Sequence, residues 1–258
     1  MLKQRFLSAL LVIPLVLAVT WAGGYFFLLA VMAIAFLAYR EFSRLAVLSQ
    51  AAVAHIFPAA SFAILLAAKF FGKEGLFAAL VTFFLLAHIF WVVAFPADFR
   101  RLLLLVWGEF YLSGLLSFFI LLRDLENGLM YVVALLFTVW ASDSGAYFCG
   151  IAFGRHKLLP AVSPKKSVEG AVAGLVFGSV CLALLAPALR MTRLAGALAG
   201  LVLSLAGQAG DLAESAFKRW ADTKDSGHFL PGHGGVLDRI DSLLFAAPLA
   251  YAIFSFFS

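Results

Sequence analysis

Long runs of apolar residues, separated by short polar breaks, dominate the chain. No Asp, Glu, Lys or Arg occurs from Phe6 to Tyr39, which is too long for one membrane-crossing helix of roughly 17–25 residues. Gly23-Gly24 divides this run into a helical hairpin. Further apolar stretches follow at about residues 45–68, 75–97, 102–122, 129–152, 170–189, 194–210 and 241–257. The pattern predicts an all-α polytopic membrane protein with about nine transmembrane helices, and Glu109 makes the stretch 102–122 the weakest of them.

The composition agrees with this prediction. Hydrophobic residues make up 64% of the 258 residues and charged residues only 13%, whereas a soluble domain is about a quarter charged. A cleaved signal peptide is excluded for the first run, because many more apolar spans follow and no convincing small-residue cleavage site occurs. We expect one integral membrane domain, 1–258, with a less specific half at 1–128 and a motif-bearing half at 129–258. Cys149 and Cys181 lie in apolar runs and are interpreted as small buried hydrophobes.

The distribution of basic residues predicts which loops face the cytoplasm. With a cytoplasmic N-terminus and nine crossings, 14 of the 19 Lys and Arg residues lie on the cytoplasmic side, as the positive-inside rule favours. Two polar loops, at about 153–169 and 211–241, then face the cytoplasm together. The second loop holds ten of the chain's 33 charged residues, which are 19 basic and 14 acidic.

The segment GQAGDLAESAFKRW carries acids and a base at helical spacing. If the eighth helix continues into the cytoplasm, Asp211, Glu214 and Lys218 lie at i, i+3 and i+7 and share one face. An ionisable group such as Asp211 at a membrane boundary is costly and is therefore a functional candidate. The alternative is a helix end that re-enters water with an ordinary solvated face.

The segment PGHGGVLDRIDS places a glycine-rich turn directly before the last apolar stretch. The backbone of residues 231–235 can approach a ligand closely, and His233 could donate a hydrogen bond to phosphate. Asp238 and Asp241 follow at i, i+3, and their like charges repel unless a cation intervenes. Oxygen ligands without nearby His or Cys pairs suit Mg²⁺ rather than zinc. The alternative is a capping turn with a solvated histidine.

The segment RHKLLPAVSPKKSVEG, residues 155–170, combines basic residues, hydroxyls and a proline-stiffened turn. It is interpreted as a phosphate-binding loop, although Lys and Arg beside a membrane also serve as topology determinants and lipid head-group contacts. Asp143, in or at the edge of the preceding span, needs a partner at that depth. It either joins the same polar cluster or forms an internal hydrogen bond.

Carboxylates, a basic loop and a glycine turn on one membrane face are typical of phosphoryl or nucleotidyl transfer. Carboxylates hold Mg²⁺, while the metal and Lys or Arg neutralise phosphates. The position at the bilayer edge indicates one lipid substrate and one water-soluble phosphorylated substrate.

The run SAFKRWADTKDSGHFLPGHGGVLDRID, Ser215 to Asp241, resembles the C-terminal signature of the phosphatidate cytidylyltransferase (CDP-diacylglycerol synthase) family. The block DSGAYFCGIAFGRHKLLPAVSPKKSVEG is similar to the family's other cytoplasmic segment, with Val168 in place of an expected aromatic residue. The resemblance implies that CTP and phosphatidic acid give CDP-diacylglycerol and pyrophosphate. It implies CTP, phosphatidic acid and membrane lipids as partners, no nucleic acid, and a homodimer as one open arrangement. It also implies a bacterial cytoplasmic (inner) membrane with the active site facing the cytoplasm.

The resemblance also implies residue roles. Asp211 and Asp238 would be Mg²⁺ ligands, and Asp241, Glu214 and Asp143 would support them or hold a second, monovalent cation. The expected phosphate-neutralising and catalytic residues are Lys166, Lys218, Arg219, Lys224, His233 and Arg239. The expected substrate-binding residues are Ser163, Lys165, Ser167, Gly234 and Gly235.

Two other functions remain open at this point. A CTP-dependent lipid or polyprenol kinase would transfer the γ-phosphate instead. An ion-coupled transporter would require broken helices in corresponding positions of two halves, and no such pairing is evident in the sequence.

Overall fold

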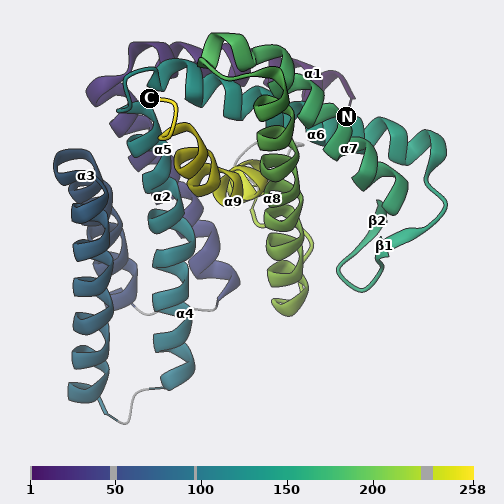
Figure 1. Cartoon of the computed structure of the whole chain (residues 1–258). Coiled ribbons are helices and arrows are strands. Elements are labelled where there is room, and N and C mark those ends of the chain that lie inside the picture. Colours follow the sequence, from purple (N-terminus) through teal and green to yellow (C-terminus); the bar gives the residue numbers. More distant parts are fainter. Residues whose placement is uncertain (1, 47–50, 96–97, 228–234) are drawn as a thin grey trace. The chain divides into compact units, whose positions relative to one another are not determined.

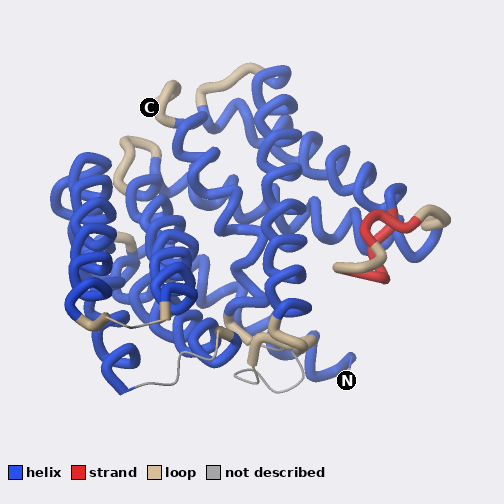
Figure 2. Tube along the Cα trace, turned by 90° about the horizontal axis from the view of Figure 1, so that it is seen from below, coloured by secondary structure: helices blue, strands red, loops and turns tan. Residues whose placement is uncertain are grey.

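The computed structural model describes residues 2–46, 51–95, 98–227 and 235–258, with side chains from residue 12 onward and, after the first gap, from residue 57. The chain divides into two compact units. Unit 1 comprises Met1–Leu121 and Ser226–Leu237, and unit 2 comprises Leu122–Asp225 and Asp238–Ser258. Helices account for nearly all regular structure (Figure 2). The single integral membrane domain expected over residues 1–258 stays a prediction.

Unit 1 is built from the N-terminal helices (Figure 1). These are α1 (Leu2–Ala22), α2 (Gly24–Leu45), α3 (Ala51–Val93), α4 (Phe99–Glu109), the π-helical turn η1 (Phe110–Gly114) and α5 (Leu115–Arg123), whose end lies in unit 2. Aromatic side chains fill its core: Tyr39 stacks on Phe57 at 4.9 Å between ring centroids. Phe42 is fully buried, and its ring occupies the space that a side chain at Gly108 would need.

Glycines interrupt the helices of unit 1 where the sequence predicts breaks between spans. Gly23 and Gly24 have φ values of 62° and 51°, which confirms the predicted turn between the first two helices. Gly72, with φ 65° and ψ −150°, breaks the long helix α3 between the predicted stretches 45–68 and 75–97. Glycine adopts positive φ without the steric cost that other residues meet. The chain can therefore turn at these points.

Unit 2 carries the polar segments. Its elements are α6 (Gly128–Phe153), β1 (Lys157–Leu159), β2 (Ser163–Ser167), α7 (Val168–Leu185), the 3₁₀ turn η2 (Ala186–Leu189), α8 (Arg193–Trp220) and α9 (Leu237–Phe254). The two strands form an antiparallel hairpin, shown in red in Figure 2. The expectation of an all-α protein is therefore correct apart from this hairpin, which replaces the irregular loop expected at 153–169.

Small residues let α6, α7 and α8 pack closely. A methyl group on Gly174 would approach Gln208 and the carbonyl of Ser142, and one on Gly178 would collide with Ser204. The side-chain amide of Gln208 on α8 donates to the carbonyl of Ala171 on α7 at 3.0 Å. Close backbone approach at small residues, joined by polar contacts, is typical of helix association in membranes.

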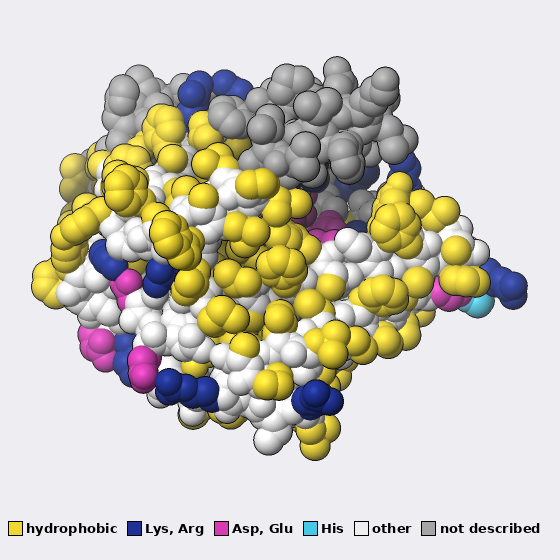
Figure 3. Space-filling view, turned by 90° about the horizontal axis from the view of Figure 1, so that it is seen from above, with side chains coloured by type: hydrophobic (Ala, Val, Ile, Leu, Met, Phe, Trp, Pro, Cys, Tyr) yellow, Lys and Arg dark blue, Asp and Glu magenta, His cyan; other side chains and the backbone are white. Residues whose placement is uncertain are grey.

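The helices identify an integral membrane protein. Among the described residues, six helices are long and apolar enough to cross a bilayer: Gly24–Leu45, Phe57–Val93, Phe99–Arg123, Gly128–Phe153, Val168–Leu189 and Arg193–Trp220. Large apolar side chains such as Val172, Val176 and Leu184 on α7 point outward, and apolar side chains cover much of the face in Figure 3. Lipid can solvate such a surface, whereas a soluble protein rarely exposes one. The count of nine spans stays a prediction.

Candidate active site

A cluster of charged residues in unit 2 comes from four elements. α6 supplies Asp143, β2 supplies Lys166, α8 supplies three residues and α9 supplies two. Because α8 continues to Trp220, beyond the apolar stretch, Asp211, Glu214 and Lys218 lie on one helix, as the sequence predicts.

Lys218 is the centre of the more buried part of this cluster. Its Nζ lies 2.5 Å from Glu214 Oε2, one helical turn earlier on α8, and 2.5 Å from Asp238 Oδ1 on α9. The side chains are 13% exposed for Lys218, 0% for Glu214 and 13% for Asp238. The other oxygen of Glu214, Oε1, is buried without a hydrogen-bond partner. One ammonium group thus compensates two carboxylates that are almost removed from water.

Lys166 forms the second, more open ion pair. Its Nζ lies 2.6 Å from Asp211 Oδ2, and both side chains are about a third exposed (28% and 32%). Ser215 Oγ donates to Asp211 Oδ1 at 3.4 Å. The pairing joins the basic hairpin to α8, so two segments far apart in the sequence meet at this carboxylate.

Two further carboxylates, Asp143 and Asp241, make the cluster more acidic. Asp143, Asp211 and Asp241 lie close enough for their charges to interact with one another. Asp241 Oδ1 also accepts a hydrogen bond from the backbone N–H of Ser242 at 2.7 Å. With Glu214 and Asp238, five carboxylates face two lysines, which leaves a formal excess of three negative charges when all are ionised.

The donor set fits a hard divalent cation. Carboxylate oxygens are the ligands that Mg²⁺ prefers, and it commonly takes one or two from protein while phosphates and water supply the rest. In the described part of the chain, no three acidic, histidine or cysteine side chains converge closely enough to hold a metal by themselves. Asp211 and Asp238, the two predicted ligands, each pair with a different lysine. Their roles at one Mg²⁺ stay a prediction.

The close approach of α8 to α9 depends on a glycine beside Asp211. A methyl group on Gly210 would clash with the carbonyl oxygen of Asp241 and approach Phe245. One turn earlier, a methyl group on Gly207 would come no closer than 3.6 Å to Ser242, an ordinary contact. The backbone of α9 can therefore lie against α8 where the carboxylates gather.

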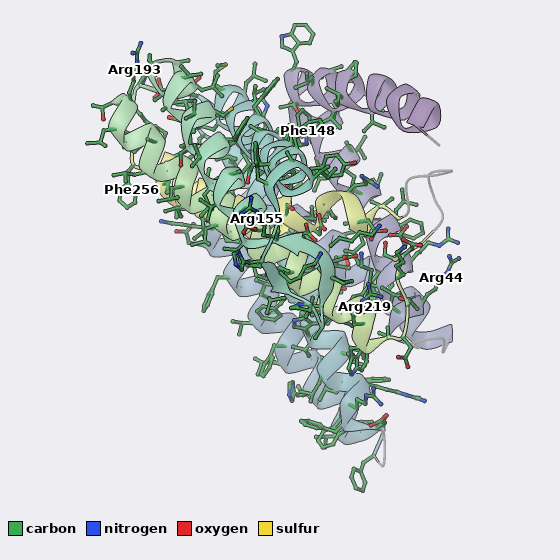
Figure 4. All side chains as sticks on the ribbon, turned by 90° about the vertical axis from the view of Figure 1, so that its right-hand side faces the viewer. Arg44, Phe148, Arg155, Arg193, Arg219 and Phe256 are labelled. Atoms are coloured by element: carbon green, nitrogen blue, oxygen red, sulfur yellow. The ribbon has the colours of Figure 1, made fainter. Side chains whose placement is uncertain are left out.

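The other predicted residues have different positions. Arg219, labelled in Figure 4, donates from Nε to the carbonyl of Val162 at 3.3 Å and so ties α8 to the hairpin. Ser167 is the N-cap of α7, accepting from the N–H of Gly170 at 3.2 Å. Lys165, Lys224 and Arg239 are exposed. Ser163, the first residue of β2, is half-buried, and Gly235 is buried. His233 and Gly234 lie outside the described residues.

Glu169 shapes the hairpin and was missed by the sequence interpretation. Its carboxylate accepts from the backbone N–H of Arg155 at 3.1 Å and of His156 at 3.2 Å, and lies 2.6 Å from His156 Nδ1. An acid in the first turn of a helix beside a chain reversal is the signal that could have identified it. This contact holds the start of the hairpin against the N-terminus of α7.

The fold and the cluster together define a class: a polytopic membrane protein with a charged, oxygen-rich site suited to phosphate chemistry. The chain belongs to the cytidylyltransferase family, whose model matches residues 3–257.

Three similar proteins are named phosphatidate cytidylyltransferase. The chain is 32% identical over 259 residues to a phosphatidate cytidylyltransferase of Staphylococcus saprophyticus, covering 96% of this chain and 97% of the relative. It is 31% identical over 254 residues to the Staphylococcus haemolyticus protein of that name, with the same coverage. It is 44% identical over 151 residues to the phosphatidate cytidylyltransferase of Bacillus subtilis, covering 57% of this chain and 56% of that relative.

Proposed function

We propose that this protein is a phosphatidate cytidylyltransferase, which makes CDP-diacylglycerol and pyrophosphate from CTP and phosphatidic acid. The observation that carries the proposal is the carboxylate and lysine cluster of α8 and α9, within a chain that matches the cytidylyltransferase family from end to end. Relatives named for this activity support it along nearly the full length.

The reaction joins two polyanions. An oxygen of the lipid phosphate attacks the α-phosphorus of CTP. The bond from that phosphorus to the oxygen bridging to the β-phosphorus breaks, and the electron pair leaves with pyrophosphate. The attacking oxygen is already anionic at neutral pH, so the reaction needs no strong general base. The main obstacle is charge repulsion, which positioned cations lower.

The chain's own residues suit this task. Lys166 on β2 and Lys218 on α8 neutralise carboxylates at 2.5–2.6 Å, and their ammonium groups are of the kind that binds phosphate. Arg219 and Glu169 hold the hairpin that carries Lys166. We assign Mg²⁺ to Asp211 and Asp238, with Asp143, Glu214 and Asp241 around them. When bound, Mg²⁺ would neutralise phosphate charge and stabilise the leaving pyrophosphate.

We further propose that the site faces the cytoplasm of a bacterial inner membrane, with nine spans and a cytoplasmic N-terminus. The excess of Lys and Arg in the segments assigned to the cytoplasm supports this orientation. Within unit 1, Glu41 near the C-terminal end of α2 accepts hydrogen bonds from Ser226 and Val236. These two segments share a side in the proposed topology.

The position of the transferred label tests the reaction. Purified protein in vesicles containing phosphatidic acid is given CTP labelled at the α- or the γ-phosphate. We expect α-label in the lipid and γ-label in pyrophosphate. γ-Label in the lipid would replace the proposal with a CTP-dependent kinase, and absence of label from the lipid in both cases would reject both activities.

Substitutions test the metal assignment separately. Asp211→Asn and Asp238→Asn each keep size and one oxygen but lose the charge, so turnover should nearly vanish while the protein still inserts. Asp222→Asn is the matched control, because Asp222 follows α8 in a left-handed conformation (φ 52°) that asparagine also tolerates. Near-normal turnover of either Asn variant at low Mg²⁺ would refute the assignment.

A further inference from the structure

Glu41, near the end of α2, has no role in the sequence interpretation, yet it is one of the most heavily bonded carboxylates in unit 1. It is only 5% exposed. Its Oε2 accepts hydrogen bonds from Ser226 Oγ at 3.1 Å and from the backbone N–H of Leu237 at 2.9 Å. Its Oε1 accepts from the backbone N–H of Val236 at 2.9 Å. One carboxylate therefore holds two points that lie ten residues apart in the chain.

These contacts give α9 a cap from a distant helix. α9 begins at Leu237, and the first N–H groups of a helix have no partner within it. A side-chain oxygen normally satisfies them from the residue directly before the helix. Here Glu41 supplies both oxygens, and its negative charge also suits the positive end of the helix dipole. Ser226 is 4% exposed and Leu237 0%, so water does not readily replace the carboxylate.

Two glycines leave room for this carboxylate. A methyl group on Gly227 would lie 2.6 Å from Glu41 Oε1. A methyl group on Gly235 would collide with Glu41 and with Ser226 Oγ. The resemblance assigned Gly235 to substrate binding. Its surroundings indicate a different reason for glycine, namely that any side chain would displace the carboxylate.

We propose that Glu41 is a positioning residue: it joins Ser226 to Leu237 and thereby fixes the first residue of the helix that carries Asp238. Leu237 is followed directly by Asp238, which pairs with Lys218. A shift at Leu237 is transmitted through one peptide bond to this carboxylate. The effect on catalysis rests on the proposed function, whereas the effect on the start of α9 does not.

Hydrogen exchange of the α9 N-terminus tests the contact directly. Glu41→Gln keeps the size of the side chain but loses its charge and turns one acceptor into a donor. Hydrogen bonds to a charged group contribute enough that their loss should speed exchange of the Val236 and Leu237 amides by about 10- to 150-fold. Unchanged exchange there would overturn the proposal, even if the protein proved to have a different activity.

The effect on catalysis is measured against a control variant that also alters a buried carboxylate. Glu109 serves, because it is 1% exposed, belongs to unit 1 and accepts hydrogen bonds from Ser61 at 3.0 Å. With wild-type protein producing CDP-lipid, Glu41→Gln should lower kcat/KM by about 10- to 100-fold, and Glu109→Gln should change it much less at similar thermal stability. Equal losses in both variants would reduce Glu41 to an ordinary structural acid and overturn the positioning role.

A second variant keeps the test decisive if Glu41→Gln does not fold. Ser226→Ala removes one of the three hydrogen bonds and leaves the charge in place. It should raise amide exchange at Leu237 and lower kcat/KM by a smaller factor, about 3- to 10-fold. A Ser226→Ala protein with wild-type exchange and wild-type kcat/KM would contradict the proposal.

Discussion

Replacing Lys218 should cost far more stability than replacing Lys166, although both lysines form short ion pairs. Lys218→Met keeps the apolar stem and removes only the ammonium group. Glu214, fully buried, and Asp238, 13% exposed, then lose the cation that lies 2.5 Å from each. Removing one partner of a buried ion pair costs about 3–5 kcal/mol, because the remaining charge is left uncompensated.

Lys166→Met is the matched comparison. The Lys166–Asp211 contact is 2.6 Å, but the side chains are 28% and 32% exposed, so water and salt can compensate Asp211. Partly exposed pairs contribute about 0–1 kcal/mol. The two variants should therefore differ by at least about 2 kcal/mol in the free energy of unfolding, or about 30-fold in the unfolding equilibrium.

The measurement is reversible unfolding in mixed micelles, with the midpoint in denaturing detergent compared for wild type and both variants. A second substitution identifies the cause. Adding Glu214→Gln to Lys218→Met removes one of the two carboxylate charges that lost the Lys218 ammonium group, so it should restore part of the lost stability. Equal losses for the two lysine variants, or no recovery in the double variant, would refute the argument that burial decides the cost.

Three further predictions concern the same unit. Lys166→Ala should lower kcat/KM, measured with labelled CTP, by about 10- to 150-fold, because a charge-assisted phosphate contact is lost. An unchanged kcat/KM would leave Lys166 as a topology determinant only. A cysteine in place of the exposed Lys157 should react with an impermeant thiol reagent only after cells are permeabilised, and reaction in intact cells would place the hairpin outside. Gly210→Ala should lower the free energy of unfolding by about 1–3 kcal/mol, because the added methyl group overpacks against α9. Gly207→Ala should be nearly neutral, and similar effects of the two substitutions would show that the contact with α9 is not tight.

The sequence determined the class of protein and much of the local structure. Apolar runs of about 17–25 residues predict membrane helices, because this length suits a spanning helix, which satisfies its backbone polar groups within one segment. Helical spacing predicted Asp211, Glu214 and Lys218 on one helix face, and all three lie within the continuous helix α8. The resemblance of the run from Ser215 to Asp241 predicted the family, and the family model matches residues 3–257.

The tertiary structure alone decided which charges meet. The sequence grouped carboxylates and lysines in two loops, but it contained nothing that paired Lys166 with Asp211 and Lys218 with Asp238. Those partners depend on how α8 lies against α9 and the hairpin, and that packing depends on a few small residues such as Gly210. The contacts of Glu41 were even less predictable from the sequence. Its neighbours Arg40 and Arg44 make it resemble one charge of an ordinary polar helix end, and its three donors come from residues 185 to 196 positions away. Helix periodicity is a property of adjacent residues, whereas a buried carboxylate is defined by the donors that the fold brings to it.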